Sequence, residues 1–272
     1  MSGKASLTKT AFAASVGISR SQLYYRRVLP EKDWTLKQKI ELVLRDYPSY
    51  GHKRIALKLR VNRKRILRVM KIFGIKPYRR RGRKFKKTKS MSVSFPNLLL
   101  TEFPHYPHHI WASDFTHVSF HGTIVYIATV LDLYTREIVG FSVLTTHSVT
   151  LVMNALFSAI HKHPRPSIIH SDHGSEYTSK DYVMLNEQLG IAMSMSKKAS
   201  PWENGYQESF YSQFKIDLGD PNRFQNLGEL VYAIYQTIHL YNTTRIHTAL
   251  KMAPAMFAER HQRSNEFIEA VS

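Results

Sequence analysis

Three carboxylates in the C-terminal two thirds of the chain could do chemistry together: Asp114, Asp172 and Glu208. Hard divalent cations such as Mg²⁺ are held by a few carboxylates, with water and phosphate oxygens filling the remaining octahedral positions. Two such ions, roughly 3.5–4 Å apart, activate a water or a 3′-hydroxyl and stabilise the leaving oxygen of an in-line phosphoryl displacement. A lone Glu on a polar helix face is more often a solvated surface charge, so this chemistry requires the three side chains to converge.

Residue patterns predict the elements that would position these carboxylates. Three β-rich runs at 109–120, 123–134 and 136–146 are separated by turn-length breaks and predict an antiparallel meander. A helix, a short buried strand, a second helix and another strand are then expected at 149–163, 166–172, 179–190 and 191–196, followed by a third helix at 200–215. This order predicts an α/β fold with a mixed sheet, flanking helices and parallel later strands.

In that fold, Asp114 lies within the first strand and Asp172 at the carboxyl end of the fourth, where open α/β sheets place their functional sites. If the two strands are neighbours, their carboxylates lie side by side. Glu208 then completes the cluster from the third helix, which Ser200 and Pro201 are suited to begin.

This third helix is expected to have two distinct faces. At 100° per residue, a buried aromatic stripe is predicted from Trp202, Tyr206, Phe210 and Phe214. The opposite, polar face is predicted from Asn204, Glu208, Tyr211 and Lys215.

The net charge of +19 is concentrated at one end of the chain. Residues 1–90 hold 27 Lys and Arg against 4 Asp and Glu, whereas residues 91–272 hold 12 against 16. Such a concentration indicates a polyanionic partner, because neutralised phosphates release their condensed counterions. Solvated tails and acidic membranes are the alternatives, but the basic residues here alternate with helical apolar periodicity, which favours folded modules that bind DNA or RNA.

Two helical modules and a basic linker carry this charge. Residues 1–45 are expected to form a helix-turn-helix with apolar Phe12, Val16 and Leu23 and a turn at Gly17, an ordinary helical hairpin being the alternative. Residues 46–78 are expected to form a second such unit, with a helix capped by Asn62 and ended by Gly74. Residues 79–103 are too charged to form a core and are assigned as a linker. The candidate DNA contacts are Arg20, Ser21, Gln22, Arg26, Arg63, Lys64, Arg65, Arg68, Arg79, Arg80, Arg81, Arg83, Lys197 and Lys198, the last two with a solvated loop as the alternative.

Four sequence words surround the carboxylates: WASDFTHV at 111–118, HSDHGSEY at 170–177, ENGYQESF at 203–210 and YNTTRIHTALKMAPAMF at 241–257. In order and spacing they resemble the motifs of the D,D(35)E transposases and retroviral integrases, with 35 residues between Asp172 and Glu208. More narrowly, the chain resembles the downstream-frame catalytic protein of two-frame bacterial insertion sequences. The resemblance covers nearly the whole chain, and four words together are far more specific than any one alone.

The resemblance implies a ribonuclease-H-like catalytic domain at 104–218 and a C-terminal helical extension at 219–272. It implies that Asp114, Asp172 and Glu208 are the catalytic residues and bind two Mg²⁺ or Mn²⁺ ions. The expected partners are double-stranded DNA, as transposon ends and as target, and further copies of the chain in a homo-oligomer on DNA. The expected activity is strand cleavage followed by strand transfer. Fusion to an upstream-frame product stays open.

Four further residues lie in or near the matching words. Asn204 and His170 are expected to contact the carboxylates and orient them without binding the metal ions themselves. Arg245 and His247 belong to the tail word, and we favour bracing of the sheet over DNA contact for them.

Composition excludes several classes of protein. The chain has no cysteine, so disulfides and cysteine-containing zinc sites are excluded. The N-terminus lacks the apolar core of a signal peptide, and the longest apolar run, 123–131, is too short to span a bilayer. A soluble, cytoplasmic protein without membrane contact is therefore expected.

The alternatives to the transposase function are a nuclease of the same fold that does not join strands, a DNA-binding regulator with an inactive catalytic domain, and a basic RNA-binding protein.

Overall fold

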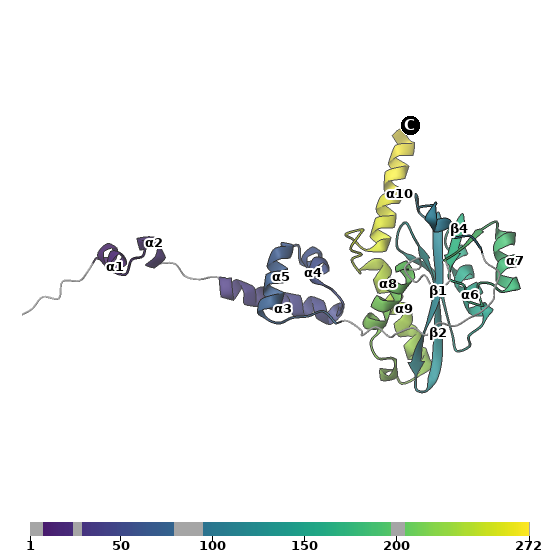
Figure 1. Cartoon of the computed structure of the whole chain (residues 1–272), viewed down its shortest axis with the longest axis horizontal. Helices are drawn as coiled ribbons and strands as arrows, with labels where there is room; N and C mark the ends of the chain where they lie inside the picture. The colour runs from purple at the N-terminus through teal and green to yellow at the C-terminus, as the bar shows by residue number, and fades with distance from the viewer. Residues whose placement is uncertain (1–7, 24–28, 79–94, 197–204, 272) are drawn as a thin grey trace, which may run out of the picture.

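A series of helices at the N-terminal end leads into a C-terminal α/β domain (Figure 1). The computed structural model of the chain describes residues 8–23, 29–78, 95–196 and 205–271. Of the helices in these ranges, none combines the length and the apolar character needed to cross a membrane.

The α/β domain is built on one sheet, which has five strands within the described residues. The strands are β1 (Ile110–Phe120), β2 (Thr123–Asp132), β3 (Ile138–Leu144), β4 (Ile168–Ser171) and β5 (Ala192–Met195). Their order is β3-β2-β1-β4-β5, in which β1, β2 and β3 pair antiparallel and β4 pairs parallel with β1 and β5. The predicted meander, the parallel later strands and the α/β class with a mixed sheet are confirmed.

Helices cover both faces of this sheet. They are α6 (Val149–Ile160), α7 (Lys180–Leu189), α8 (Gly205–Leu218) and α9 (Leu227–Thr243), with short 3-10 turns at η1 (Leu98–Leu100) and η3 (Pro221–Arg223). The last helix, α10 (Pro254–Val271), packs against α9. In Figure 1, α6 and α7 lie on one side of β1, and α8 and α9 lie on the other. As predicted, Ser179 caps α7, and Gly190 ends it in the left-handed region.

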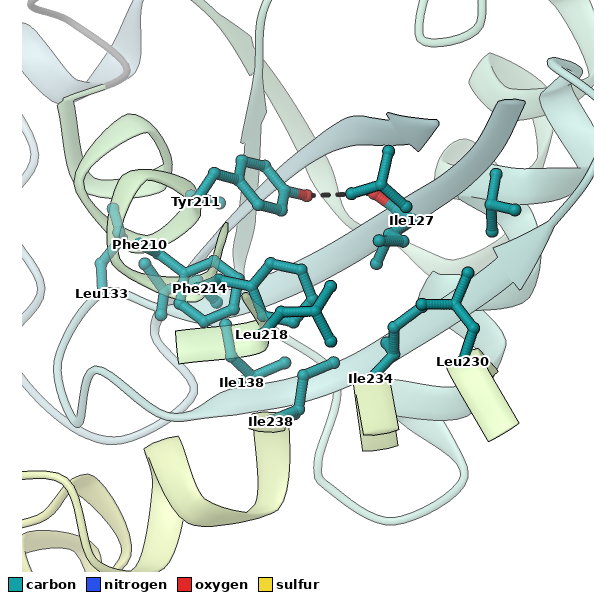
Figure 2. Close-up of a cluster of buried hydrophobic side chains, with 14 of the residues drawn as sticks. Ile127, Leu133, Ile138, Phe210, Tyr211, Phe214, Leu218, Leu230, Ile234 and Ile238 are labelled. Atoms are coloured by element: carbon teal, nitrogen blue, oxygen red, sulfur yellow. Dashed lines mark hydrogen bonds between the residues drawn. The ribbon is translucent and has the colours of Figure 1, made fainter. Parts of the chain in front are cut away.

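Each face of the sheet has its own apolar core. On the α8 side, Phe210 and Phe214 pack with Ile138 and with Ile234 and Ile238 of α9 (Figure 2). The strands β1, β2 and β4 contribute apolar side chains to both cores.

On the other face, α6 approaches β3 very closely. A Cβ at Gly140 would lie 2.5 Å from the carbonyl oxygen of Ala155 and 2.6 Å from the Cβ of Ala159, so only glycine fits there.

The aromatic stripe predicted for α8 is only partly right. Phe210 and Phe214 are buried, but Tyr206 is 46% exposed, and Tyr211, expected on the polar face, is buried. The reason is that α8 packs against both the sheet and α9, so its buried surface is wider than a single stripe. The predicted start of this helix at 200–202 lies outside the described residues.

The helices α3 (Leu29–Asp46), α4 (His52–Leu59) and α5 (Arg63–Ile72) share one core, centred on the fully buried Ile40, Ile55 and Ile66. This core extends across the module boundary predicted at residue 45. Asn62 caps α5 by accepting the N–H of Lys64 at 2.8 Å, and Gly74 follows the helix in the left-handed region, both as predicted.

The first two helices are α1 (Lys9–Ser15) and α2 (Arg20–Leu23), with the predicted turn at Gly17 between them. The apolar Phe12 and Val16 are exposed, with exposed fractions of 49% and 55%. Two helices this short present apolar side chains that need a third element to cover them, and none of the described residues does so. The helix-turn-helix assignment stays a prediction.

Candidate active site

Asp114 and Asp172 lie on neighbouring strands at matching positions. The parallel strands β1 and β4 have Ala112 and His170 as their last paired residues on this side. Asp114 lies two residues beyond Ala112, and Asp172 lies two residues beyond His170, just past the end of β4. Because neighbouring strands are about 4.8 Å apart, this register sets the two residues side by side. The condition set from the sequence, that the first and fourth strands are neighbours, is met.

A tight turn holds Asp172 in place. Its Oδ1 atom accepts the N–H of Gly174 at 2.9 Å. A Cβ at position 174 would lie 3.0 Å from this oxygen and 3.1 Å from Oε2 of Glu176, so glycine leaves room for both carboxylates. Burial raises the pKa of Asp172, and the charge of Glu176 raises it further, whereas the Gly174 N–H and His173 lower it. Asp172 therefore lies in a half-buried, acidic corner of the domain.

On one side of the acidic corner, Glu176 contacts the ring of His147. Glu176 is buried, and its Oε1 lies 2.8 Å from Nε2 of His147 and accepts the hydroxyl of Ser175 at 3.1 Å. His147 in turn stacks on Tyr126 of β2, with the ring centroids 5.1 Å apart. His147 and Ser175 are thus the partners that fix the position of Glu176 beside Asp172.

Two buried side chains anchor α8 on the strands next to Asp114. Nε2 of Gln207 donates to the carbonyl oxygens of Ala112 at 2.6 Å and Thr129 at 3.3 Å, and the hydroxyl of Thr129 donates back to Gln207 at 3.2 Å. The hydroxyl of Tyr211 donates to the carbonyl oxygen of Asp114 at 2.6 Å and lies 2.8 Å from Oγ1 of Thr129. The first turns of α8 are thereby bonded to both β1 and β2.

Glu208 lies on α8 between these two anchors in the sequence. It follows Gln207 directly and precedes Tyr211 by about one turn. Its side chain is exposed, and partial desolvation raises its pKa. Within the described residues, no three His, Asp or Glu side chains lie close enough together to hold a metal ion. The structure thus places Asp114 and Asp172 on neighbouring parts of the sheet, and Glu208 on the adjoining helix.

The donor set itself suits a hard cation. All three side chains offer carboxylate oxygens, the ligands that Mg²⁺ and Mn²⁺ prefer. Asp114 and Asp172 are half-buried and Glu208 is exposed, so water and phosphate oxygens can reach the remaining coordination positions. Like-charged carboxylates repel one another unless a cation neutralises them. The residues present therefore fit the implied ions in their chemistry.

One of the two expected supporting residues can be placed. His170 is 1% exposed, and its Nδ1 lies 2.9 Å from Oγ of Ser194 on β5, an oxygen that also accepts the N–H of Leu98. His170 thus ties β4 to β5, two residues before Asp172. Asn204 lies outside the described residues.

The predicted DNA contacts are spread over the helical modules. Arg20 and Ser21 are exposed on α2, and Arg63 and Lys64 are exposed on α5, whereas Arg65 is half-buried. Arg68 donates to the buried Asp33 at 2.6 Å and thereby ties α5 to α3. The residues outside the described ranges are Arg26, Arg79, Arg80, Arg81, Arg83, Lys197 and Lys198, together with the side chain of Gln22.

Sequence reasoning missed the anchoring roles of Gln207 and Tyr211. Both lie within one turn of Glu208, and Gln207 belongs to the same sequence word, which was the available signal. A glutamine is usually exposed, so its complete burial here could not be expected from residue type.

Comparison with known proteins identifies the family. Residues 104–201 and 189–254 each match a family described as the integrase core domain. The chain is 34% identical to the transposase for insertion sequence element IS904 of Lactococcus lactis subsp. lactis, over 79% of this chain and 89% of that protein. It belongs to the insertion-sequence transposases. This transposase is also 33% identical to a 31 kDa protein of insertion element IS600 of Shigella sonnei, over 91% of its own length and 97% of that protein. It is 29% identical to the putative transposase InsK for insertion sequence element IS150 of Escherichia coli K12, over 86% and 87% of the two chains.

A solved structure supports the fold assignment of the transposase. The simian T-cell lymphotropic virus intasome in complex with the PP2A regulatory subunit B56 gamma contains a chain that matches with a TM-score of 0.51 and 17% identity, over 77% of this chain and 70% of that chain. At this identity the likeness concerns the fold alone. The transposase has the ribonuclease-H-like fold that its motifs imply, within the retroviral-integrase-like superfamily.

Proposed function

We propose that this chain is a DNA transposase that binds the ends of an insertion sequence, cuts the DNA there and joins the freed 3′ end to a target. The observation that carries the proposal is the register of β1 and β4, which sets Asp114 beside Asp172. The anchoring of α8 on the same strands supports the proposal, because it bonds the helix that carries Glu208 to the strands β1 and β2. Membership of the insertion-sequence transposases supports DNA as the substrate.

In the proposed reaction, Asp114, Asp172 and Glu208 hold two Mg²⁺ or Mn²⁺ ions. When bound, such ions activate the attacking water or 3′-hydroxyl and stabilise the leaving oxygen. The other residues of the site act by positioning: the turn at Gly174 orients Asp172, and Gln207 and Tyr211 fix α8. No side chain needs to bond covalently to DNA, which distinguishes this chemistry from that of a Tyr or Ser recombinase.

The N-terminal helices would recognise the ends of the element. Exposed basic residues on α5, such as Arg63 and Lys64, suit phosphate contacts that position the protein on DNA. Sequence choice would come from side chains that reach base edges in the major groove, for which Arg20 and Ser21 of α2 are candidates. Joining two ends needs more than one active site, so the working form is proposed to be a homo-oligomer on DNA.

The decisive test compares Glu208→Gln with the wild-type protein. The substrate is a labelled duplex carrying the end of the element, incubated with Mg²⁺ at equal DNA occupancy of both proteins. Because the amide removes one metal-binding charge without changing the side-chain shape, we expect normal end binding and a loss of nicking and joining of at least 100-fold, on the order of several kcal/mol in barrier.

The matched control is Glu187→Gln, which makes the same change at an exposed position on α7. It should nick and join like the wild type. Full activity of Glu208→Gln would disprove the assignment of the three carboxylates. Nicking without joining by the wild type would identify a nuclease, and sequence-specific binding without any nicking would identify a regulator.

A further inference from the structure

A pocket opens on the flank of α8 that faces away from Glu208. Tyr206 and Gln213 of α8 line it, and at 100° per residue Glu208 lies on nearly the opposite side of the helix. The pocket is completed by four basic residues from three separate parts of the chain, namely Arg54 of α4, Arg136 of the turn between β2 and β3, and Arg245 and His247 after α9. We call this set the arginine pocket.

One acidic side chain balances part of this charge. Arg245 is 3% exposed, forms an ion pair with Asp217 and donates to the hydroxyl of Ser49 at 2.8 Å. These are the contacts of a bracing residue, as favoured for Arg245 from the sequence. Asp217 is therefore engaged with Arg245 and also attracts Arg54, so one carboxylate faces two of the pocket's three guanidinium groups.

The remaining basic groups have uncharged hydrogen-bond partners, or buried nitrogen atoms that lack such a partner among the described residues. Arg54 donates to the hydroxyl of Thr248 at 3.1 Å and to Oε1 of Gln213 at 3.0 Å, both uncharged. The guanidinium of Arg136 lies 4.1 Å from the ring centroid of Tyr206, and its buried Nη1 has no hydrogen-bond partner among the described residues. Nδ1 of His247, also buried, likewise lacks a partner there.

The pKa values of two pocket residues, Arg54 and His247, reflect an excess of positive charge in the pocket. Burial and the charge of Arg245 lower the pKa of Arg54. Burial, followed by Arg136, Arg54 and Arg245, lowers the pKa of His247 to about 4. Both shifts oppose further positive charge, and a bound anion would relieve that opposition.

The backbone of Arg136 adopts a conformation that is uncommon for an arginine. Its φ of 65° lies in the left-handed region, which disfavours residues other than glycine, asparagine and aspartate. The turn holds it there through a hydrogen bond from the Arg136 N–H to the carbonyl oxygen of Asp132 at 2.9 Å. The carboxylate of Asp132 is itself bonded to the N–H groups of Tyr134 and His108, so it does not serve as the acceptor that Arg136 lacks.

We propose that the arginine pocket binds a phosphodiester group of the DNA backbone, at a site separate from the three carboxylates. Guanidinium groups bind phosphate with paired, charge-assisted hydrogen bonds, and several of them here converge with an aromatic wall. The ligand class rests on the proposed function, because the transposase must hold DNA. Arg54 belongs to the helical module formed by α3, α4 and α5, and the other basic residues belong to the α/β domain. A phosphate in the pocket would therefore fix the helical module against the α/β domain.

The experiment measures binding of the full-length chain to a labelled duplex carrying the element's end, without divalent metal and over a range of salt concentrations. Arg136→Gln should weaken binding on the order of tenfold near 0.15 M salt and reduce the slope of log K against log salt by about 1. Arg136→Lys should recover part of the affinity. The control Arg165→Gln, an exposed arginine between α6 and β4, should match the wild type.

A second measurement tests for a direct contact even if Arg136→Gln is unstable. Ethylation of individual backbone phosphates of the duplex should identify one position at which ethylation weakens binding by the wild type but not by His247→Gln. Wild-type affinity and salt slope in both variants would overturn the proposal. So would protection of the wild type against thermal unfolding by inorganic phosphate without any change in DNA affinity of the variants, since the pocket would then bind only small anions.

These outcomes are independent of the carboxylate test. If the wild type binds the duplex but neither nicks nor joins it, the proposed activity fails while the binding data still decide the role of the pocket. If the wild type nicks and joins but the pocket variants bind normally, only the pocket proposal fails.

Discussion

His247 is held neutral by its surroundings. Burial is the main cause, and the guanidinium groups of Arg136, Arg54 and Arg245 add to it, so the pKa of His247 falls from its ordinary 6.5 to about 4. Unfolding removes both effects and returns the imidazole to its ordinary pKa. Between these two values the unfolded chain binds a proton that the folded chain does not.

This difference predicts a pH dependence of stability. Since the unfolded state binds more protons between about pH 4 and 6.5, the free energy of unfolding should fall as the pH is lowered through that window. His247→Gln removes this contribution. The midpoint of thermal unfolding of the variant should therefore drop less between pH 7 and pH 5 than that of the wild type.

His108 and His163, whose pKa values burial also lowers, remain in both proteins and cancel in the comparison. His161→Gln makes the same chemical change at an exposed histidine outside the arginine pocket and is the matched control. An identical pH slope for wild type and His247→Gln would show that His247 does not titrate as inferred.

At the scale of elements, α8 depends on two polar anchors as well as on its apolar face. Gln207→Leu would keep most of the side-chain volume but leave the carbonyl oxygens of Ala112 and Thr129 without this donor. Buried groups that lose their partner cost about 1–3 kcal/mol. Denaturant unfolding should show a loss of this size, together with slower nicking at saturating DNA because Glu208 is less well placed.

The control is Gln188→Leu, at an exposed position on α7. It should change the free energy of unfolding by about 0.5 kcal/mol or less. An equal loss in both variants would mean that Gln207 does not act through its buried hydrogen bonds.

The strands and helices of the α/β domain were predictable because each has a strong local pattern and clear ends. The three hairpin strands, the short strand before Asp172 and the helix between Ser179 and Gly190 all follow from hydrophobic period, turn residues and caps. The neighbouring positions of Asp114 and Asp172 depended on a strand order that the sequence left as a condition and the structure supplies.

Other features could not be predicted, because they depend on contacts between distant residues. Helical periodicity groups Tyr206 with Phe210 and separates Tyr211 from them, but it does not say that the sheet covers one flank of α8 and α9 another. The exposure of Phe12 and Val16 has the same origin. The arginine pocket was missed because its members come from separate parts of the chain.

At the scale of the whole molecule, polar contacts join the helical module to the α/β domain, on the α8 side of the sheet (Figure 1). The hydroxyl of Tyr50 accepts the N–H of Ile246 at 2.8 Å, and Tyr47 donates to the hydroxyl of Thr244 at 3.1 Å. Ser49 donates to Asp217 at 3.4 Å. The module that would bind the DNA end is therefore in direct contact with the helix that carries Glu208.

Asp217→Asn should affect stability and DNA binding in opposite directions. Loss of the charged partner of Arg245 should lower the free energy of unfolding by about 1.5–3 kcal/mol. The same change adds net positive charge beside the arginine pocket, so affinity for the labelled duplex should rise a few-fold at low salt. Thermal unfolding and anisotropy titrations on one preparation measure both effects.

Asp181→Asn, on the exposed first turn of α7, removes a charge without breaking such a pair and is the control. Weaker DNA binding by Asp217→Asn at normal folded content would contradict the charge argument. It would indicate instead that Asp217 acts on DNA by holding the junction together.

The parallel register of β1 and β4 also limits how the gene can change in length. The chain between Asp114 and Asp172 passes through two hairpins and the helix α6, whose loops can absorb inserted or deleted codons. Within β4 the side chains alternate between the two faces, so losing a single codon there would turn Asp172 away from Asp114. Length variation among functional copies of this element should therefore fall in the loops and be absent from the few codons that pair these two strands.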